Sequence, residues 1–428
     1  MSRILLKNAH YFSTDGTAKQ GDIAIENDII LSVGESVAED FIPDRTIECK
    51  DKFVIPGFIN THTHAAMGLF RSYADDMLLM DWLQKKIWPI EGKMESDDFY
   101  WGTMLGIAEM IQSGTTMFAD MYMGMERVAE AVEETGIRAV IARGMAGVAP
   151  TAESALVNSE YLYNTYHGTA DGRLRVMLGP HAPYTCPPDY LTRVVALSEK
   201  LGAEIHIHLA ETQGEVNDCL KLYGKTPMAL MDEVGLLDRG VLAAHCVVLS
   251  EEDIALMAAK NVRVAHNPGS NMKLASGIAP VPALLKAGVC VGLGTDGSSS
   301  NNNLDMLEEV HLAALLHKVN TLDPLAVPAH TALRMGTTEG AVALGVGDTI
   351  GRIEAGYQAD LTIFDMNQIA WTPRHDLVSL LVYAANSSHV DTVMVAGKIL
   401  MENRRLTTID EERVKFETNR SIKRLLQA

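Results

Sequence analysis

The sequence predicts an α/β fold: a (β/α)8 barrel of the TIM type with a small β-sandwich domain built from both chain ends. Eight short apolar runs alternate with amphipathic stretches, which is the pattern of parallel strands joined by helices. Several of these runs are apolar at every position, as expected for strands that are buried on both faces. At both chain ends, apolar and polar residues instead alternate with the period of a half-buried strand.

The barrel prediction depends on the number and order of the apolar runs. Eight parallel strands with helices between them close into a ring, so the count favours a barrel over an open sheet. We expect the strands at residues 53–60, 115–120, 138–142, 174–179, 204–208, 241–245, 262–266 and 289–294. The clearest helical stretches are residues 98–112, 125–135, 188–201, 251–259 and 280–287.

The two chain ends are predicted to form a domain of their own. Residues 1–52 and 348–410 both contain alternating strand patterns, but neither piece carries enough apolar surface to fold alone. We therefore expect them to combine into one β-sandwich beside a barrel of residues 53–347. Residues 411–428 have the pattern of a charged amphipathic helix.

Composition narrows the class of protein and its expected partners. The chain has 428 residues, of which 47% are hydrophobic and 21% charged, an ordinary globular balance. Its net charge of −19 argues against a nucleic-acid partner, which needs a basic surface. No apolar run is long enough to span a membrane. Five scattered cysteines and an N-terminus without a signal-like apolar stretch predict a cytoplasmic location.

Polar residues that can bind a metal follow several of the predicted strands. His62 and His64 are two apart, so their side chains point to the same side of strand one. His208 ends strand five, His245 ends strand six, and Asp296 follows strand eight. The carboxyl ends of barrel strands form the active-site mouth, so we expect these side chains to converge.

Neutral imidazoles together with one carboxylate are ligands that suit zinc. Bound zinc lowers the pKa of a water molecule, which makes hydroxide available near neutral pH. Glu211 lies three residues beyond His208 and is placed to move protons at the same opening. We expect His206 to fill the barrel interior and His266 to support the site rather than to act in catalysis.

Longer segments resemble a known family. Residues 56–64 (PGFINTHTH) resemble the strand-one signature of the amidohydrolase superfamily, and residues 295–297 (TDG) match a later landmark. Residues 179–184 (GPHAPY), 266–271 (HNPGSN) and 294–302 (GTDGSSSNN) are similar to the 5′-methylthioadenosine/S-adenosylhomocysteine deaminase family. The resemblance extends over nearly the whole chain.

The resemblance implies a zinc-dependent hydrolytic deamination. The 6-amino group of 5′-methylthioadenosine, S-adenosylhomocysteine or a related 5′-substituted adenosine would be replaced, giving the inosine analogue and ammonia. One divalent ion is implied, because residues 179–181 (GPH) stand where a bridging lysine would sit in two-metal members. Its implied ligands are His62, His64, His208 and Asp296.

The resemblance also assigns catalytic roles. Glu211 would pass a proton to N1 of adenine, which makes C6 electrophilic. Asp296 would accept a proton from the attacking water and later help ammonia to leave. His245 would stabilise the attacking oxygen.

The same resemblance assigns the substrate contacts. His181 would contact the purine or its sugar, Glu91 the ribose hydroxyls, and Trp82 the thioether side. Arg143 would meet the carboxylate of S-adenosylhomocysteine. Some members carry a second arginine after strand three, but residues 145–159 contain none, which favours smaller 5′-substituents.

Two alternatives remain open from the sequence. A related amidohydrolase acting on guanine, cytosine or a triazine would use the same metal ligands. A barrel of this superfamily that has lost catalysis would act as an assembly protein, but this chain keeps every predicted ligand. The expected partner is a small-molecule adenosine derivative, and a homo-oligomer is an open expectation.

Overall fold

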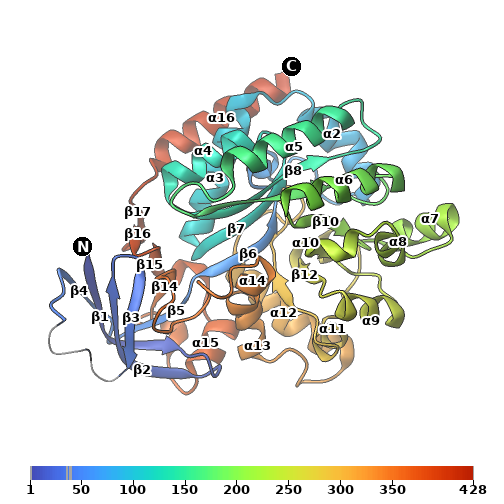
Figure 1. Ribbon diagram of the computed structural model, residues 1–428. Coiled ribbons are helices and arrows are strands. Elements are labelled where there is room, and N and C mark those ends of the chain that lie inside the picture. Colours follow the sequence, from blue (N-terminus) through green and yellow to red (C-terminus); the bar gives the residue numbers. More distant parts are fainter. Residues whose placement is uncertain (1, 35–36, 38–40, 428) are drawn as a thin grey trace.

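The computed structural model describes residues 2–34, 37 and 41–427. The parts of the predicted β-domain and terminal helix that fall on residues 1, 35–36, 38–40 and 428 lie outside the described residues. A helix-covered barrel stands beside a separate sheet, and the N-terminus lies at that sheet (Figure 1). The C-terminus lies on the far side of the barrel, at the end of α16 (Glu411–Gln427) (Figure 1).

The barrel strands follow the chain around a ring. Each neighbouring pair is parallel, and the order of the eight described strands runs without interruption from β6 to β13. Two hydrogen bonds join the first strand to the last strand and to the residues just after it: Thr61 Oγ1 donates to the Leu293 carbonyl (2.8 Å), and Asp296 N donates to the His62 carbonyl (2.9 Å). The predicted (β/α)8 barrel is therefore confirmed. Its strands are β6 (Phe58–Thr63), β7 (Thr115–Tyr122), β8 (Arg138–Met145), β9 (Leu174–Pro180), β10 (Ile205–Leu209), β11 (Val241–His245), β12 (Arg263–His266) and β13 (Val291–Leu293).

The strand predicted over residues 53–60 is wrong as a single element. It consists of β5 (Lys52–Pro56), which pairs with strands of the small sheet, and β6, which belongs to the barrel. Gly57 separates them, and a Cβ there would lie 2.1 Å from Thr116 Oγ1. Only glycine lets the chain pass this closely from one sheet to the other. The domain limits given above stay predictions.

The five predicted helical stretches are present with small shifts of their ends. They are α3 (Ser96–Gln112), α4 (Met125–Thr135), α6 (Pro188–Leu201), α9 (Glu251–Ala259) and α11 (Val281–Lys286). Helix α9 begins at a capping box of Ser250 and Asp253, and α4 ends at Gly136 in the left-handed conformation, both common helix boundaries. The other described helices are η1 (Ala65–Phe70), α1 (Leu79–Trp82), η2 (Leu83–Ile87), α2 (Trp88–Glu91), α5 (Ala152–Tyr166), α7 (Gln213–Tyr223), α8 (Pro227–Glu233), η3 (Leu236–Arg239), α10 (Pro268–Lys273), α12 (Met306–Thr321), α13 (Ala329–Met335), α14 (Thr338–Ala343), η4 (Ile369–Trp371), α15 (Leu377–Tyr383) and η5 (Ser387–His389).

Strands from both chain ends combine in the small domain, as predicted. Among the described residues the sheet has nine strands, mostly antiparallel, and β14 pairs with β5 at its centre. The sheet is tied to the barrel by Arg138 on β8, whose guanidinium binds the buried carboxylate of Asp360 (2.5 and 3.0 Å). The strands not yet named are β1 (Arg3–Phe12), β2 (Ala18–Glu26), β3 (Ile29–Gly34), β4 (Arg45–Glu48), β14 (Leu361–Asp365), β15 (Val390–Val395), β16 (Lys398–Glu402) and β17 (Arg405–Leu406).

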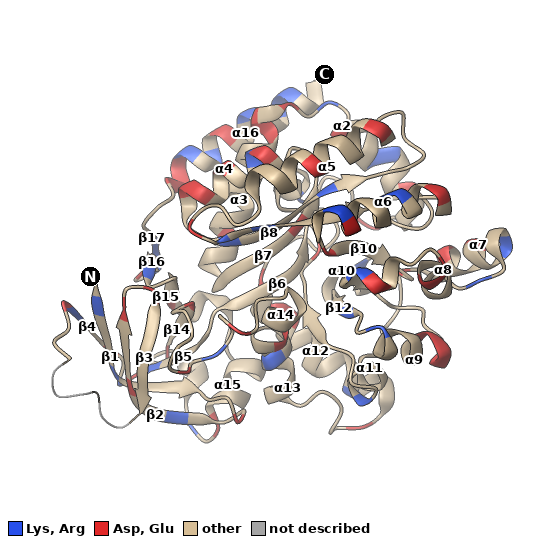
Figure 2. Cartoon of the chain, viewed as in Figure 1, with Lys and Arg blue, Asp and Glu red and all other residues tan. Residues whose placement is uncertain are grey.

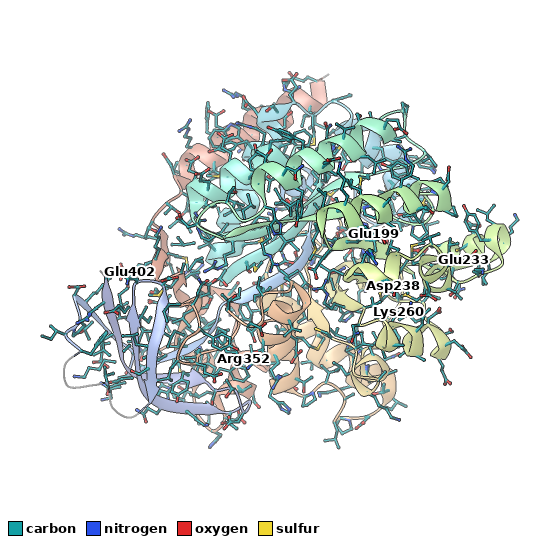
Figure 3. All side chains as sticks on the ribbon, viewed as in Figure 1. Glu199, Glu233, Asp238, Lys260, Arg352 and Glu402 are labelled. Atoms are coloured by element: carbon teal, nitrogen blue, oxygen red, sulfur yellow. The ribbon has the colours of Figure 1, made fainter. Side chains whose placement is uncertain are left out.

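Charge lies mainly on the outer helices, while the barrel strands carry little of it (Figure 2). Lys260, for example, pairs with Asp232 and Asp238, both at 2.9 Å. Figure 3 shows Lys260 and Asp238 close together. Surface pairs of this kind add little to stability. Within the described ranges, no helix is long and apolar enough to cross a membrane.

Candidate active site

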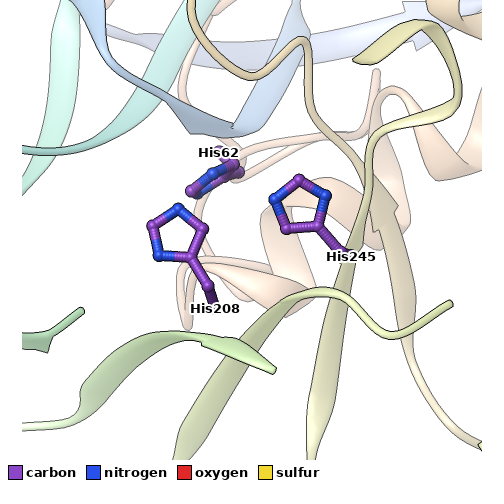
Figure 4. Close-up of side chains that lie close together, drawn as sticks. All are labelled: His62, His208 and His245. Carbon is purple, nitrogen blue, oxygen red and sulfur yellow. The ribbon is translucent and has the colours of Figure 1, made fainter. Parts of the chain in front are cut away.

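Four predicted ligand groups meet at the carboxyl ends of the barrel strands. Asp296 Oδ1 lies 3.2 Å from His64 Nε2 and 3.5 Å from His62 Nε2. His208 Nε2 lies 3.4 Å from His64 Nε2. Figure 4 shows the rings of His62 and His208 close together, with His245 beside them. His62 Nε2 is buried without a hydrogen-bond partner in the described part of the chain, so this donor set fits one divalent ion.

Nδ1 of His64 and Nδ1 of His208, which face away from the cluster, each contact a backbone carbonyl. His64 Nδ1 lies 2.5 Å from the Met121 carbonyl, and His208 Nδ1 lies 2.8 Å from the His181 carbonyl. A carbonyl accepts only from N–H, so these bonds place the proton of a neutral ring on Nδ1 and leave its Nε2 able to bind a metal.

His62 is held by a residue that was predicted only to fill space. His62 Nδ1 lies 2.9 Å from Nε2 of His206, which is fully buried. If Nδ1 donates in this contact, His62 Nε2 is left free for the metal. The His-Ile-His pattern at residues 206–208 was a signal for this role, because His206 and His208 share one side of β10.

Asp296 is fixed by hydroxyl groups that sequence reasoning missed. Its Oδ2 accepts from Ser270 Oγ (2.7 Å) and from Ser300 Oγ (2.9 Å), while the Gly297 N–H donates to Oδ1 (2.8 Å). Asp296 also has a positive φ of 60°, uncommon for a residue with a side chain. These contacts direct Oδ1 toward the histidines.

Glu211 and His245 face each other next to the ligand cluster. His245 Nε2 lies 4.0 Å from Glu211 Oε2, and its Nδ1 lies 2.8 Å from Asn271 Oδ1. Burial raises the pKa of Glu211, and the neighbouring His245 opposes the rise. Glu211 therefore keeps its proton to a higher pH than an exposed glutamate, which suits a proton donor.

A second buried carboxylate positions Glu211. The two oxygens of Glu215 accept the backbone N–H groups of Ala210 and Glu211, each at 2.8 Å. Ala210 has a positive φ of 52°, and the two bonds hold the backbone in that turn. Glu215 was not predicted as a site residue.

A cavity of about 240 Å³ opens above the ligand cluster. Its wall is mainly apolar, with a few polar groups near the strand ends, as in many small-molecule sites. It brings together the predicted residues Trp82, Glu91, His181, Glu211, His245 and Asp296. Its apolar wall includes Met67, Leu79, Leu83, Trp88, Met121, Met123, Met145 and Leu274.

The predicted substrate-binding residues differ in their hydrogen bonds and in their protonation. Trp82 is buried, with Nε1 donating to the Ala74 carbonyl (3.1 Å). Glu91 accepts from the Tyr122 hydroxyl (2.5 Å). Burial lowers the pKa of His181 to about 4, so this ring is neutral at physiological pH.

Arg143 does not lie among the predicted residues that line the cavity. It is half-buried on β8 and is absent from the residues that line the cavity, as far as the described chain shows. Its Nε is buried without a hydrogen-bond partner within the described residues. Its role toward a substrate carboxylate stays a prediction.

A closed (β/α)8 barrel with a histidine–aspartate cluster at its strand ends defines the class of metal-dependent hydrolases. The amidohydrolase family profile matches residues 53–400, and the chain belongs to this family. The predicted superfamily is therefore confirmed.

Full-length relatives confirm the finer resemblance. The 5-methylthioadenosine/S-adenosylhomocysteine deaminase of Syntrophomonas wolfei is 52% identical, with 99% of each chain covered. The protein of the same name from Pelotomaculum thermopropionicum is 53% identical over 100% of this chain and 99% of its own.

Solved structures agree with the fold. An adenosine deaminase from Xanthomonas campestris with bound zinc has a TM-score of 0.95 and 35% identity, covering 100% of this chain and 99% of its own. A zinc complex of atrazine chlorohydrolase from Arthrobacter aurescens has a TM-score of 0.90 and 26% identity, covering 98% and 100%.

Proposed function

We propose that the chain is a zinc-dependent deaminase that replaces the 6-amino group of 5′-methylthioadenosine, S-adenosylhomocysteine or a related 5′-substituted adenosine. The products are the inosine analogue and ammonia. The observation that carries the proposal is the convergence of His64, Asp296 and Glu211 at the floor of one cavity. The similarity to relatives that bear this name over their full length supports it.

In the proposed mechanism, His62, His64, His208 and Asp296 hold the metal. Zinc, when bound, lowers the pKa of water and so supplies hydroxide near neutral pH. Glu211 gives a proton to N1 of adenine, which makes C6 electrophilic. Asp296 takes one proton from the attacking water and returns it to the departing amino group, so ammonia leaves neutral. The second proton of that water restores the one that Glu211 gave to N1.

The remaining cavity residues bind and orient the substrate. His245 faces Glu211 at 4.0 Å and stabilises the attacking oxygen. Glu91 accepts from the ribose hydroxyls, and neutral His181 contacts the purine or its sugar. Trp82 walls the thioether side, and Arg143 remains the proposed partner of the homocysteine carboxylate.

The test is a substrate panel for the zinc-loaded enzyme. Loss of adenine absorbance and release of ammonia are followed for adenosine, 5′-deoxyadenosine, 5′-methylthioadenosine and S-adenosylhomocysteine, with guanine, cytosine and atrazine as comparisons. We expect turnover of the adenosine compounds alone. Turnover of guanine, cytosine or atrazine in their place would contradict the proposal, and a chain that takes up no stoichiometric metal would favour a non-catalytic barrel.

The expected partner is thus one small nucleoside, with no nucleic acid or membrane involved. A cytoplasmic location remains a prediction of the sequence, and a homo-oligomer remains an open expectation.

A further inference from the structure

Residues 267–271 (NPGSN) lie between the end of β12 and the middle of α10, and the proposed mechanism uses none of them. The segment nevertheless contacts two of the catalytic groups. Ser270 Oγ donates to Asp296 Oδ2 at 2.7 Å, and Asn271 Oδ1 lies 2.8 Å from His245 Nδ1. Asn271 and His245 are both almost fully buried, so bulk water does not compete for this second contact.

The contact with Asn271 decides which ring nitrogen of His245 carries the proton. An amide oxygen only accepts hydrogen bonds, so His245 Nδ1 is the donor. In the neutral ring, the other nitrogen, Nε2, then has a lone pair and no proton. The second neighbour of Nδ1 is Asn267 Nδ2 at 3.4 Å, a contact too long to compete with the bond of 2.8 Å.

The backbone of His245 is held in an unusual conformation. His245 is the last residue of β11 and has a φ of 73°, and Cys246 follows with a φ of 49°. Such values are uncommon outside glycine and persist where the surroundings fix the chain. The Cys246 N–H donates to the Leu209 carbonyl (3.1 Å) in this turn. With Nδ1 bonded to Asn271, Nε2 lies on the cavity side of the ring, 4.0 Å from Glu211 Oε2.

We infer that Asn271 is a positioning residue, which holds His245 in the form with its proton on Nδ1 so that Nε2 accepts a hydrogen bond from the attacking water. This inference rests on the proposed function. A water molecule that donates one hydrogen to Nε2 has its other hydrogen free for Asp296 and an oxygen lone pair free to face C6. A proton on Nε2 would instead make the ring a donor, which would occupy a lone pair of that oxygen.

The direct test is the position of the proton on His245 in the zinc-loaded enzyme. Ring ¹⁵N chemical shifts distinguish protonated from unprotonated nitrogens, and the spectrum of His245→Gln identifies the signals of this ring. We expect a proton on Nδ1 and none on Nε2 in the wild type at neutral pH. In Asn271→Leu, Nε2 should gain a proton at the expense of Nδ1. A proton on Nε2 in the wild type, or an unchanged position in a folded Asn271→Leu variant, overturns the inference.

The kinetic test uses an isosteric substitution. Asn271→Leu should lower kcat for 5′-methylthioadenosine by about 10–100-fold with little change in KM, because the orientation of the water rather than substrate binding is lost. Asn271→Asp keeps an oxygen acceptor and removes the amide donor, so it should recover most of this loss. If Asn271 were the donor to His245, aspartate would fail as badly as leucine. Equal losses in the two variants would therefore overturn the inference.

The matched control is Asn267→Leu, because Asn267 is equally buried and is the more distant neighbour of the same ring nitrogen. This variant should keep the wild-type proton position on His245. A shift as large as that in Asn271→Leu would show that loss of packing, rather than loss of the acceptor, moves the proton. If the zinc-loaded wild type turns over adenosine compounds but carries the proton on Nε2, the inference fails alone. If it turns over none of them, the proposed function fails, and the spectra still decide which nitrogen carries the proton.

Discussion

At the scale of single residues, the site depends on side chains whose free atoms are directed by a second contact. His64 and His208 each present Nε2 to the cluster because Nδ1 is bonded to a backbone carbonyl. Asp296 presents Oδ1 because Ser270 and Ser300 bind Oδ2. Such outer contacts are expected to tune metal affinity as well as geometry.

Glu211→Gln should retain zinc but lose about 10²–10⁴-fold in kcat, because glutamine cannot move the proton that general acid–base catalysis requires. Zinc content by metal analysis and kcat for 5′-methylthioadenosine are measured on the same preparation. Near-normal turnover would remove Glu211 from the mechanism.

His206→Leu should weaken zinc binding by about 10–100-fold, because His62 Nδ1 loses its partner. Zinc affinity is measured by competition with a chelator, which does not depend on activity. His206→Gln offers an acceptor at this position and should weaken binding less. Unchanged affinity in a folded His206→Leu variant would show that the histidine only fills the barrel.

The proposed ligand residues could be predicted from the sequence and its family resemblance, whereas the residues that support them could not. His62, His64, His208 and Asp296 follow apolar runs whose ends must meet in a barrel. The contacts of Ser270 and Ser300 with Asp296 depend on how two loops pack, which no local pattern records.

At the scale of elements, the loops after β12 and β13 are joined by Glu309 of α12. Its carboxylate accepts from the Gly269 N–H (3.0 Å) and from Asn301 Nδ2 (2.8 Å). Asn301 in turn donates to the Thr295 carbonyl beside Asp296 (2.8 Å). A buried carboxylate on a covering helix thus supports the loop that holds Asp296, a proposed metal ligand.

Burial raises the pKa of Glu309 to about 8, above its unfolded value, so its ionisation costs stability in the folded state. This cost appears as pH rises from the unfolded pKa to the folded one and is complete above about pH 8. Glu309→Gln should therefore make Tm depend less on pH between about pH 4.5 and pH 8. An identical pH dependence in the wild type and the variant would contradict this assignment.

Strand one shows where element prediction failed. Residues 53–60 form one apolar run, and hydrophobic period alone does not reveal that β5 and β6 enter different sheets. The close approach of Gly57 to Thr116 causes the division, and it is a property of the packed fold.

At the scale of the whole molecule, Asp360 binds the small sheet to the barrel. It accepts from Arg138 on β8 and from the Ala396 N–H (2.7 Å), and the pair is almost fully buried. The patterns of apolar and polar residues predicted the small sheet and the barrel as separate units. The contact between them depends on the three-dimensional arrangement, so the sequence patterns could not predict it.

Asp360→Asn should lower the free energy of unfolding by about 3–5 kcal/mol, because a buried guanidinium loses its counter-charge. The measurement is denaturant unfolding followed by circular dichroism. Glu153→Gln is the control, since the exposed Glu153–Arg193 pair should leave the midpoint unchanged. Equal midpoints for Asp360→Asn and the wild type would show that the ion pair does not hold the domains together.

The proposed reaction at this site replaces the 6-amino group of an adenosine compound with a solvent oxygen. Mass spectrometry of the product formed by the zinc-loaded enzyme from 5′-methylthioadenosine in ¹⁸O-labelled water tests it most directly. We expect an inosine analogue that carries one labelled oxygen on its purine ring, together with ammonia. Recovery of unchanged substrate, or release of free adenine through cleavage of the glycosidic bond, would contradict it.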